Sequence, residues 1–202
     1  MITKRISNDI GVIGIDEVGR GAWSGPLVAC SVLLKKSILD KKEIYEINDS
    51  KKISQKKRQI LSSFIKKNSI YNFGISKVEE IDKLNVNNAT QLAMKRSFEP
   101  FLSIGRNVKI DGLNFFFLNN KTEFIVKGDQ KSISIASASI LAKVFRDEEM
   151  KKLSKIFKYY DWENNMGYGT KKHLLGIKNH GITNVHRKSF APVKSFLLKE
   201  EV

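Results

Sequence analysis

Three aspartates stand where β-type segments of the sequence end. Asp16 follows Val-Ile-Gly-Ile, Asp111 follows Val-Lys-Ile, and Asp129 follows Phe-Ile-Val-Lys-Gly, while Glu17 comes directly after Asp16. Each aspartate lies within three residues of a glycine, which lets backbone or substrate approach closely. Because open α/β sheets place their ligand sites at strand ends, we expect these carboxylates to gather at one point.

Gathered carboxylates favour a hard divalent cation. They repel one another, and burial raises that cost, so a proton or a cation must join them. Oxygen ligands without Cys or His suit Mg²⁺ or Mn²⁺, and two such ions can activate water and stabilise a leaving oxygen in phosphodiester hydrolysis. The alternative, in which each Asp caps a turn or pairs with a lysine, stays open.

The adjacent acids Asp16 and Glu17 raise a geometric difficulty. Neighbours on a regular strand point to opposite faces of the sheet. We therefore expect the Glu17-Val18-Gly19 turn to bend the backbone, or Glu17 to contribute through its carbonyl group.

The elements that must position these acids are visible as alternating and helical patterns. Strands are expected at residues 12–15, 27–34, 71–75, 107–110 and 123–126, the first two paired as a hairpin through a Gly-rich turn. Helices are expected at residues 55–67, behind Ser54 as N-cap, and at 85–98, 132–157, 170–178 and 193–199. This order indicates a single α/β domain over residues 1–202, with a helical C-terminal segment at about 150–202.

The charge of the chain has two interpretations. Lys plus Arg number 36 against 21 Asp plus Glu, which gives a net charge of +15. Such a surface suits a polyanion, because cations that neutralise phosphates release condensed counterions. Lysine greatly outnumbers arginine, however, and Ile and Asn are frequent, as an AT-rich genome would produce on any protein surface. Charge alone does not decide between them.

The apolar runs, the N-terminus and the cysteine count indicate the cellular compartment. No apolar run is long enough to span a membrane, and the N-terminus shows no signal peptide. The single Cys30 excludes an internal disulfide and suits a reducing compartment. We predict a cytoplasmic protein that does not bind membranes and is a monomer.

A series of motifs carries a family resemblance. Residues 14–28, GIDEVGRGAWSGPLV, resemble the ribonuclease HII family, and the likeness continues over almost the whole chain. Further matching segments follow in family order at residues 49–54, 88–94, 110–112, 127–129, 137–143, 167–170 and 186–192. The resemblance implies a ribonuclease H-like α/β fold, with a mixed central sheet flanked by helices and a helical C-terminal part.

The resemblance also implies roles for individual residues. Four residues match the family's metal-binding acidic quartet: Asp16, Glu17, Asp111 and Asp129. In the family this quartet holds Mg²⁺ or Mn²⁺, with two ions bound when substrate is present. The loop that reads the ribose 2′-hydroxyl at an RNA–DNA junction matches Gly19, Arg20 and Gly21, and the tyrosine that packs on the sugar beyond the junction matches Tyr168.

The implied activity is endonucleolytic hydrolysis of RNA in RNA–DNA hybrids. The enzyme is expected to cut 5′ of a ribonucleotide in duplex DNA, leaving 3′-hydroxyl and 5′-phosphate ends, and to act in DNA repair and replication by removing misincorporated ribonucleotides and RNA primers. Two alternatives remain. A non-catalytic duplex-binding module has no reason for three strand-end acids. A DNA nuclease or recombinase with the same acidic core has no need of the loop at residues 19–21 or of Tyr168.

Other polar residues have simpler interpretations. Lys143 and Arg146, one helical turn apart, are expected to form a solvated basic face, and Asp147 to pair with Lys151. His186 is expected to order the C-terminal segment.

Overall fold

A mixed five-stranded sheet forms the centre of the computed structural model, which describes residues 9–113, 116, 118–119 and 121–200. The strand order is β3-β2-β1-β4-β5, with β2 antiparallel to both β1 and β3, and β4 parallel to both β1 and β5. The strands are β1 (Ile13–Val18), β2 (Leu27–Leu34), β3 (Ser69–Ser76), β4 (Val108–Asp111) and β5 (Thr122–Ile125). The predicted hairpin of the first two strands is confirmed.

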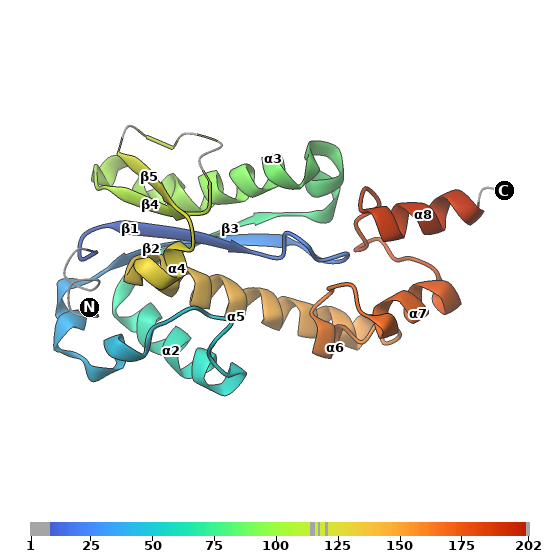
Figure 1. Ribbon diagram of the computed structural model, residues 1–202, viewed down its shortest axis with the longest axis horizontal. Helices are drawn as coiled ribbons and strands as arrows, with labels where there is room; N and C mark the ends of the chain where they lie inside the picture. The colour runs from blue at the N-terminus through green and yellow to red at the C-terminus, as the bar shows by residue number, and fades with distance from the viewer. Residues whose placement is uncertain (1–8, 114–115, 117, 120, 201–202) are drawn as a thin grey trace.

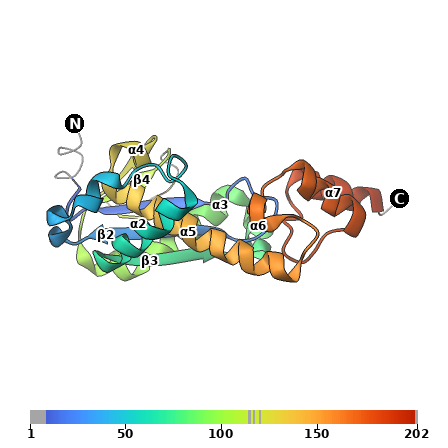
Figure 2. The same ribbon diagram turned by 90° about the horizontal axis from the view of Figure 1, so that it is seen from below.

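Helices cover both faces of this sheet. Figure 1 shows α3 on one face and α2 with α5 on the other, and Figure 2 shows the C-terminal helices beyond the end of the sheet. The α-helices are α2 (Gln55–Lys67), α3 (Val78–Phe98), α4 (Gly128–Lys131), α5 (Ile133–Ile156), α6 (Trp162–Asn165), α7 (Lys171–His180) and α8 (Ala191–Glu200). Short 3-10 helices span Lys36–Asp40, Lys42–Glu46 and Glu99–Ile104. The predicted α/β arrangement with a helical C-terminal part is confirmed.

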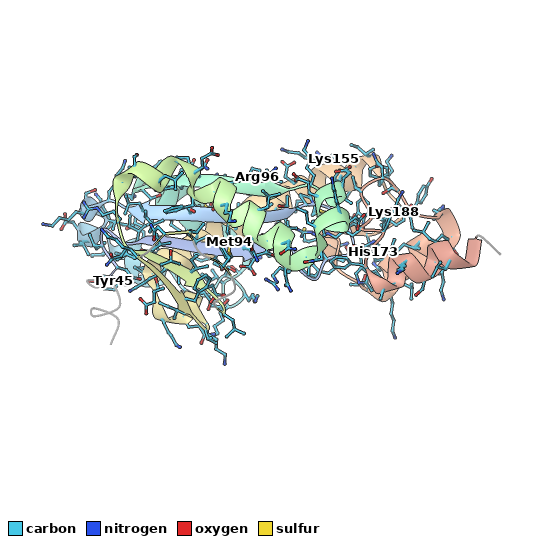
Figure 3. The ribbon with its side chains drawn as sticks, turned by 90° about the horizontal axis from the view of Figure 1, so that it is seen from above. Tyr45, Met94, Arg96, Lys155, His173 and Lys188 are labelled. Carbon is cyan, nitrogen blue, oxygen red and sulfur yellow. The ribbon has the colours of Figure 1, made fainter. Side chains whose placement is uncertain are left out.

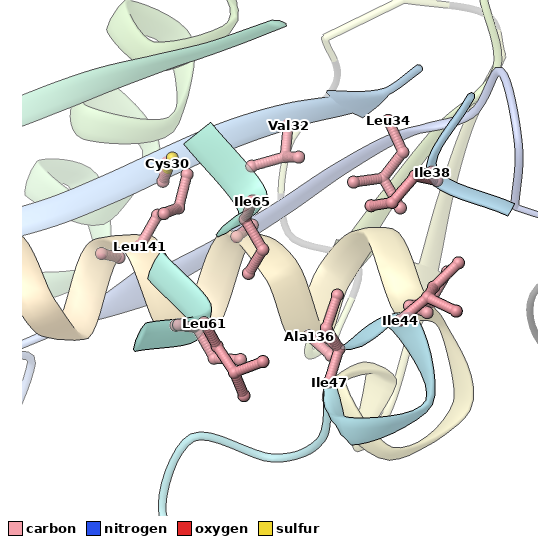
Figure 4. Close-up of a cluster of buried hydrophobic side chains, with 14 of the residues drawn as sticks. Cys30, Val32, Leu34, Ile38, Ile44, Ile47, Leu61, Ile65, Ala136 and Leu141 are labelled. Carbon is pink, nitrogen blue, oxygen red and sulfur yellow. The ribbon is translucent and has the colours of Figure 1, made fainter. Parts of the chain in front are cut away.

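Two apolar layers hold the sheet between its helices. One lies against α5 and α2, where Val32, Leu61 and Leu141 meet (Figure 4). The other lies against α3, with Ile15 and Met94 among its members. Because β2 is buried on both faces, its sequence is almost continuously apolar instead of alternating.

Helix α3 differs from its prediction at the N-terminus. It begins already at Val78 and is interrupted at Asn85, which has a positive φ of 68°. The Asn85 side chain accepts hydrogen bonds from the backbone N–H groups of Asn87 and Asn88, as an N-cap does. The predicted start at residue 85 is therefore the start of the second part of the helix.

The C-terminal helices pack around an apolar cluster of their own, which includes Met150, Trp162 and Val193. No helix in the part of the chain that the structure describes combines the length and apolarity needed to span a bilayer. The N-terminal segment in which we expect no signal peptide lies, at residues 1–8, outside the described residues.

Candidate active site

All four predicted acids line one cavity of about 430 Å³. Asp16 comes from β1 and Asp111 from the end of β4, and these strands are parallel neighbours. The residues around the cavity are Asp16, Glu17, Val18, Ser50, Lys51, Asp111, Asp129, Ser139, Lys143 and Tyr168. The predicted gathering of the acids is thus present in the fold, and Tyr168 stands at the same cavity.

The position of Asp16 within its strand corrects one expectation. β1 continues to Val18, so Asp16 lies inside the strand, and Glu17 keeps regular register opposite Ala29. No bend of the ladder is needed, because the pairing of β1 with β4 ends at Ile15. Beyond that point none of the described residues pairs with β1 on this side, and both acids border the same cavity.

Asp129 also differs from its prediction, because it lies on the short helix α4 and not at a strand end. Lys127, with a left-handed φ of 56°, turns the chain from β5 into this helix. The Gly128 N–H donates to Asp111 Oδ1 at 2.6 Å, which ties α4 to the end of β4. The side chain of Asp129 therefore reaches the cavity from a helix.

Burial and mutual repulsion perturb the acids. Burial, followed by the charges of Glu17 and Asp111, raises the pKa of Asp16 well above its ordinary value. Burial raises the pKa of Glu17 to about 7, although the nearby Arg20 guanidinium opposes the change. Burial, followed by the charges of Asp49 and Asp111, also raises the pKa of Asp129. A cation bound among these carboxylates would offset both their burial and their mutual repulsion.

A fifth acid, Asp49, belongs to this neighbourhood and was not predicted as a site residue. It is buried, interacts with Asp129, and accepts a 2.9 Å hydrogen bond from the backbone N–H of Lys51. Asp49 is the first residue of the family-like segment at residues 49–54, so the family resemblance could have identified it as a site residue. The strand-end argument could not find it, because residues 49–52 follow a 3-10 helix.

The predicted recognition loop borders a second cavity, of about 660 Å³, that adjoins the first at Glu17 and Asp111. Arg20 donates to the side chain of Asn87 at 2.9 Å, and its guanidinium lies 3.8 Å from Glu17. Asn87, Asn88 and Gln91 of α3 line this cavity as well. None was predicted as a site residue, although Asn88 and Gln91 belong to the family-like segment at residues 88–94. The two cavities share Glu17 and Asp111, so together they extend from the acids to Arg20.

Comparison with known proteins agrees with this geometry. The sequence profile of ribonuclease HII matches residues 13–193. A ribonuclease HII of Pelagibacter ubique is 48% identical over 185 residues, which cover 91% of this chain and 97% of that protein. The chain belongs to the ribonuclease HII family. It is therefore a hydrolase of the ribonuclease H type.

Solved structures show the same fold. The ribonuclease H2 of Pyrococcus horikoshii superposes with a TM-score of 0.76 at 21% identity, covering 94% of this chain and 98% of that one. Bst-RNase HIII, solved in complex with Mn²⁺, gives a TM-score of 0.74 at 17% identity over 95% of this chain and 70% of that one. The predicted ribonuclease H-like fold is confirmed.

Two expectations about α5 are wrong. Arg146 is 0% exposed and does not lie on a solvated face. Asp147 pairs with Lys143 at 2.7 Å, on the N-terminal side, and not with Lys151. Spacing could not decide between these partners because both lie one helical turn away from Asp147.

The four acids of this ribonuclease HII form a donor set that fits a divalent cation. The ligand atoms are oxygens only, and burial raises the pKa of Asp16, Glu17 and Asp129, so a cation bound among them would favour their charged forms. Among the described residues, no three His, Cys, Asp or Glu side chains already stand as a formed coordination shell. The carboxylates would have to close around an ion.

A buried histidine pair links the C-terminal segment to Tyr168 (Figure 3 labels His173). The Thr183 N–H donates to His186 Nδ1 at 2.9 Å, so His186 carries its proton on Nε2 and donates to His173 Nε2 at 3.2 Å. Trp162 also donates to that nitrogen, which leaves His173 Nδ1–H to donate to the Tyr168 carbonyl at 3.0 Å. Both rings are therefore neutral. The expected role of His186 in ordering this segment agrees with these contacts.

This pair predicts a pH-dependent contribution to stability. Burial lowers the pKa of His186 to about 3, so its contribution is complete above the unfolded value of 6.5 and is lost as the pH falls toward 3. His186→Gln is expected to lower the free energy of unfolding by about 2 kcal/mol at pH 7. Its difference from the wild type should shrink as the pH falls below 6.5, measured by urea unfolding. His180→Gln, at an exposed ring, is the control, and a difference independent of pH would contradict the assignment.

Proposed function

We propose that this ribonuclease HII is a divalent-metal-dependent endonuclease that cleaves the RNA strand of RNA–DNA hybrids. It cuts 5′ of single ribonucleotides embedded in duplex DNA and leaves 3′-hydroxyl and 5′-phosphate ends. The observation that carries the proposal is the common cavity of the acids and Tyr168, which adjoins the loop at residues 19–21.

Four acidic side chains would bind the metal ions that the hydrolysis requires. Asp16, Glu17, Asp111 and Asp129 would hold Mg²⁺ or Mn²⁺, two ions when substrate is bound. When bound, such ions supply Lewis-acid activation of water and stabilisation of the departing 3′-oxygen. The structure of Bst-RNase HIII with Mn²⁺ supports the choice of metal. The carboxylates that would hold the ions come from β1, the end of β4 and α4.

The loop and the tyrosine supply recognition. The 2′-hydroxyl is what separates RNA from DNA, and backbone groups at Gly19 and Gly21 can approach it without a side chain between them. Gly21 has open space around its Cα, with no atom within 4 Å of where a Cβ would stand. Arg20 completes the loop, and Tyr168 would pack on the sugar beyond the junction.

The cellular role follows from the substrate. The enzyme would remove misincorporated ribonucleotides and RNA primers, as a cytoplasmic monomer that acts on RNA–DNA hybrids or on DNA duplexes containing ribonucleotides. Lys51 and Lys143, which border the acid cavity, provide positive charge for the phosphates.

The decisive experiment is cleavage of a DNA duplex that contains one ribonucleotide, with Mg²⁺ and then with Mn²⁺. We expect a single cut 5′ of the ribonucleotide, with ends identified by mass spectrometry. The same duplex with a deoxyribonucleotide at that position is the matched control. Absence of a cut beside the ribonucleotide in both ions would refute the proposal.

A further inference from the structure

Two fully buried arginines lie behind the loop that joins β1 to β2. Arg146 of α5 and Arg187, in the segment before α8, are both 0% exposed. Neither forms an ion pair with a carboxylate among the residues that the structure describes. Burying a guanidinium without a carboxylate partner costs free energy. The hydrogen bonds that each arginine makes therefore indicate its structural role.

Arg146 binds backbone from two separate segments. Its Nε donates to the Pro26 carbonyl at 2.8 Å and its Nη2 to the Ser24 carbonyl at 3.0 Å, both in the β1–β2 loop. Its Nη1 donates to the Met166 carbonyl at 2.8 Å, two residues before Tyr168. The guanidinium carbon also lies 5.4 Å from the centre of the Tyr168 ring. One side chain thus joins the β1–β2 loop to the segment that carries Tyr168.

Arg187 holds the same loop from the C-terminal side. Its Nε donates to the Gly25 carbonyl at 3.0 Å and its Nη1 to the Arg20 carbonyl at 3.1 Å. Its own N–H donates to the Trp23 carbonyl at 2.8 Å. The Arg20 carbonyl belongs to the loop at residues 19–21, so this contact fixes the backbone that is proposed to read the 2′-hydroxyl.

The two recognition segments also touch directly. The N–H groups of Trp23 and Ser24 donate to the Gly167 carbonyl at 2.8 and 3.2 Å. Gly167 has a positive φ of 81°, and a Cβ there would lie 2.6 Å from the Ser24 carbonyl oxygen. Gly19, with φ of 94°, would place a Cβ 2.3 Å from Arg146 Nε. The glycines allow this close approach, and the arginines hold it.

We propose that Arg146 and Arg187 are positioning residues that set the distance between the loop at residues 19–21 and Tyr168. This distance determines how strongly the enzyme prefers a ribonucleotide followed by a deoxyribonucleotide over continuous RNA. A sugar bearing a 2′-hydroxyl is crowded against Tyr168 when the two segments are held together, and it is tolerated when they separate. The inference rests on the proposed function.

The test is a ratio of two cleavage efficiencies in Arg146→Lys and Arg187→Lys. Lysine keeps the positive charge but lacks the planar fork that reaches several carbonyls. For each variant, kcat/KM is measured on a duplex with one embedded ribonucleotide and on a continuous RNA–DNA hybrid of the same sequence. We expect the ratio of the first to the second to fall about 10-fold or more, because a displacement of about 1 Å can cost ~100-fold.

A matched control is Arg96→Lys. Arg96 lies on α3 (Figure 3), pairs with Glu80, and also donates to a backbone carbonyl, that of Ile75. Its variant should keep the wild-type ratio. Equal losses on both substrates in the Arg146 and Arg187 variants would mean a merely structural role and would overturn the inference, as would an unchanged ratio.

A second variant covers the case in which the lysine variants do not fold. Gly167→Ala leaves both guanidinium groups in place but pushes against the Ser24 carbonyl. The ratio should fall in this variant too, and an unchanged ratio there overturns the inference. Failure of the proposed function is distinguishable, because in that case the wild type itself makes no cut beside the ribonucleotide.

Discussion

Replacement of Asp16 by asparagine is expected to lower the cleavage rate by about two to three orders of magnitude. Removing one preorganised group that stabilises a transition state costs ~10²–10³. Asp16 is central to the acid cluster, since its pKa is raised by burial and by both Glu17 and Asp111. The amide keeps the shape of the side chain but removes the charge that would hold a cation. The measurement is kcat on a duplex with one ribonucleotide at saturating Mg²⁺.

The raised pKa of Glu17 also predicts how the stability of the metal-free protein depends on pH. A carboxyl whose pKa is raised in the folded protein stabilises the fold below its unfolded pKa, and that contribution disappears as the pH rises through the folded value. For Glu17 the interval runs from 4.5 to about 7, which corresponds to about 3 kcal/mol at most. Metal-free wild type should therefore lose stability over this interval, and Mg²⁺ should restore it.

Asp16→Asn should be at least as stable as the wild type at pH 7 without metal, because one buried charge and its repulsion are gone. It should gain less from Mg²⁺ in thermal denaturation. Asp40→Asn, at an exposed position, is the matched control and should resemble the wild type. An active Asp16→Asn enzyme, or one whose melting temperature rises with Mg²⁺ as the wild type's does, would remove Asp16 from the metal-binding set.

Gly14→Ala is expected to destabilise the fold strongly. Gly14 is buried in β1, and a Cβ there would lie 2.1 Å from the backbone carbon of Ser134 and 2.4 Å from the backbone N of Ile135. The first turn of α5 would have to move away from the sheet. Overpacking of a core costs about 1–3 kcal/mol even where side chains can adjust, and here the obstacle is backbone. We expect a loss of about 3 kcal/mol or more in urea unfolding.

Gly21→Ala provides the matched control for that measurement. Its Cβ would meet no atom within 4 Å, and its φ is not positive. The free energy of unfolding should change by no more than about 0.5 kcal/mol, as for an ordinary surface substitution. Equal stability losses in the two variants would contradict the close approach of β1 to α5.

Much of the fold could be predicted from local patterns. The strand at residues 27–34 and the helix after Ser54 have the predicted bounds, and the Ser54 side chain accepts from the Lys57 N–H as an N-cap should. These features depend on side-chain periodicity and capping, which are written within a few residues of sequence. The interruption of α3 at Asn85 also left a local signal, although it did not reveal that the helix begins at Val78.

Placement of the acids was only partly predictable. The sequence indicated that Asp16, Asp111 and Asp129 would meet, but Asp16 lies inside β1 and Asp129 on α4. Strand length depends on pairing with neighbours, and a single strand does not contain that information. Asp49 reaches Asp129 from a distant segment, so no periodicity could bring it into the site.

The sequence by itself determined the types of residue available for chemistry, the family, and most helices and strands, because composition, motif and periodicity are local properties. Only the tertiary structure decided which Lys and Arg side chains are buried. Lys143 and Arg146 lie one turn apart on α5, yet the first borders the acid cavity and the second is enclosed by backbone carbonyls. Burial depends on which segments pack over a helix. In this case those segments are the β1–β2 loop and the residues before Tyr168, which lie more than a hundred residues apart in the sequence.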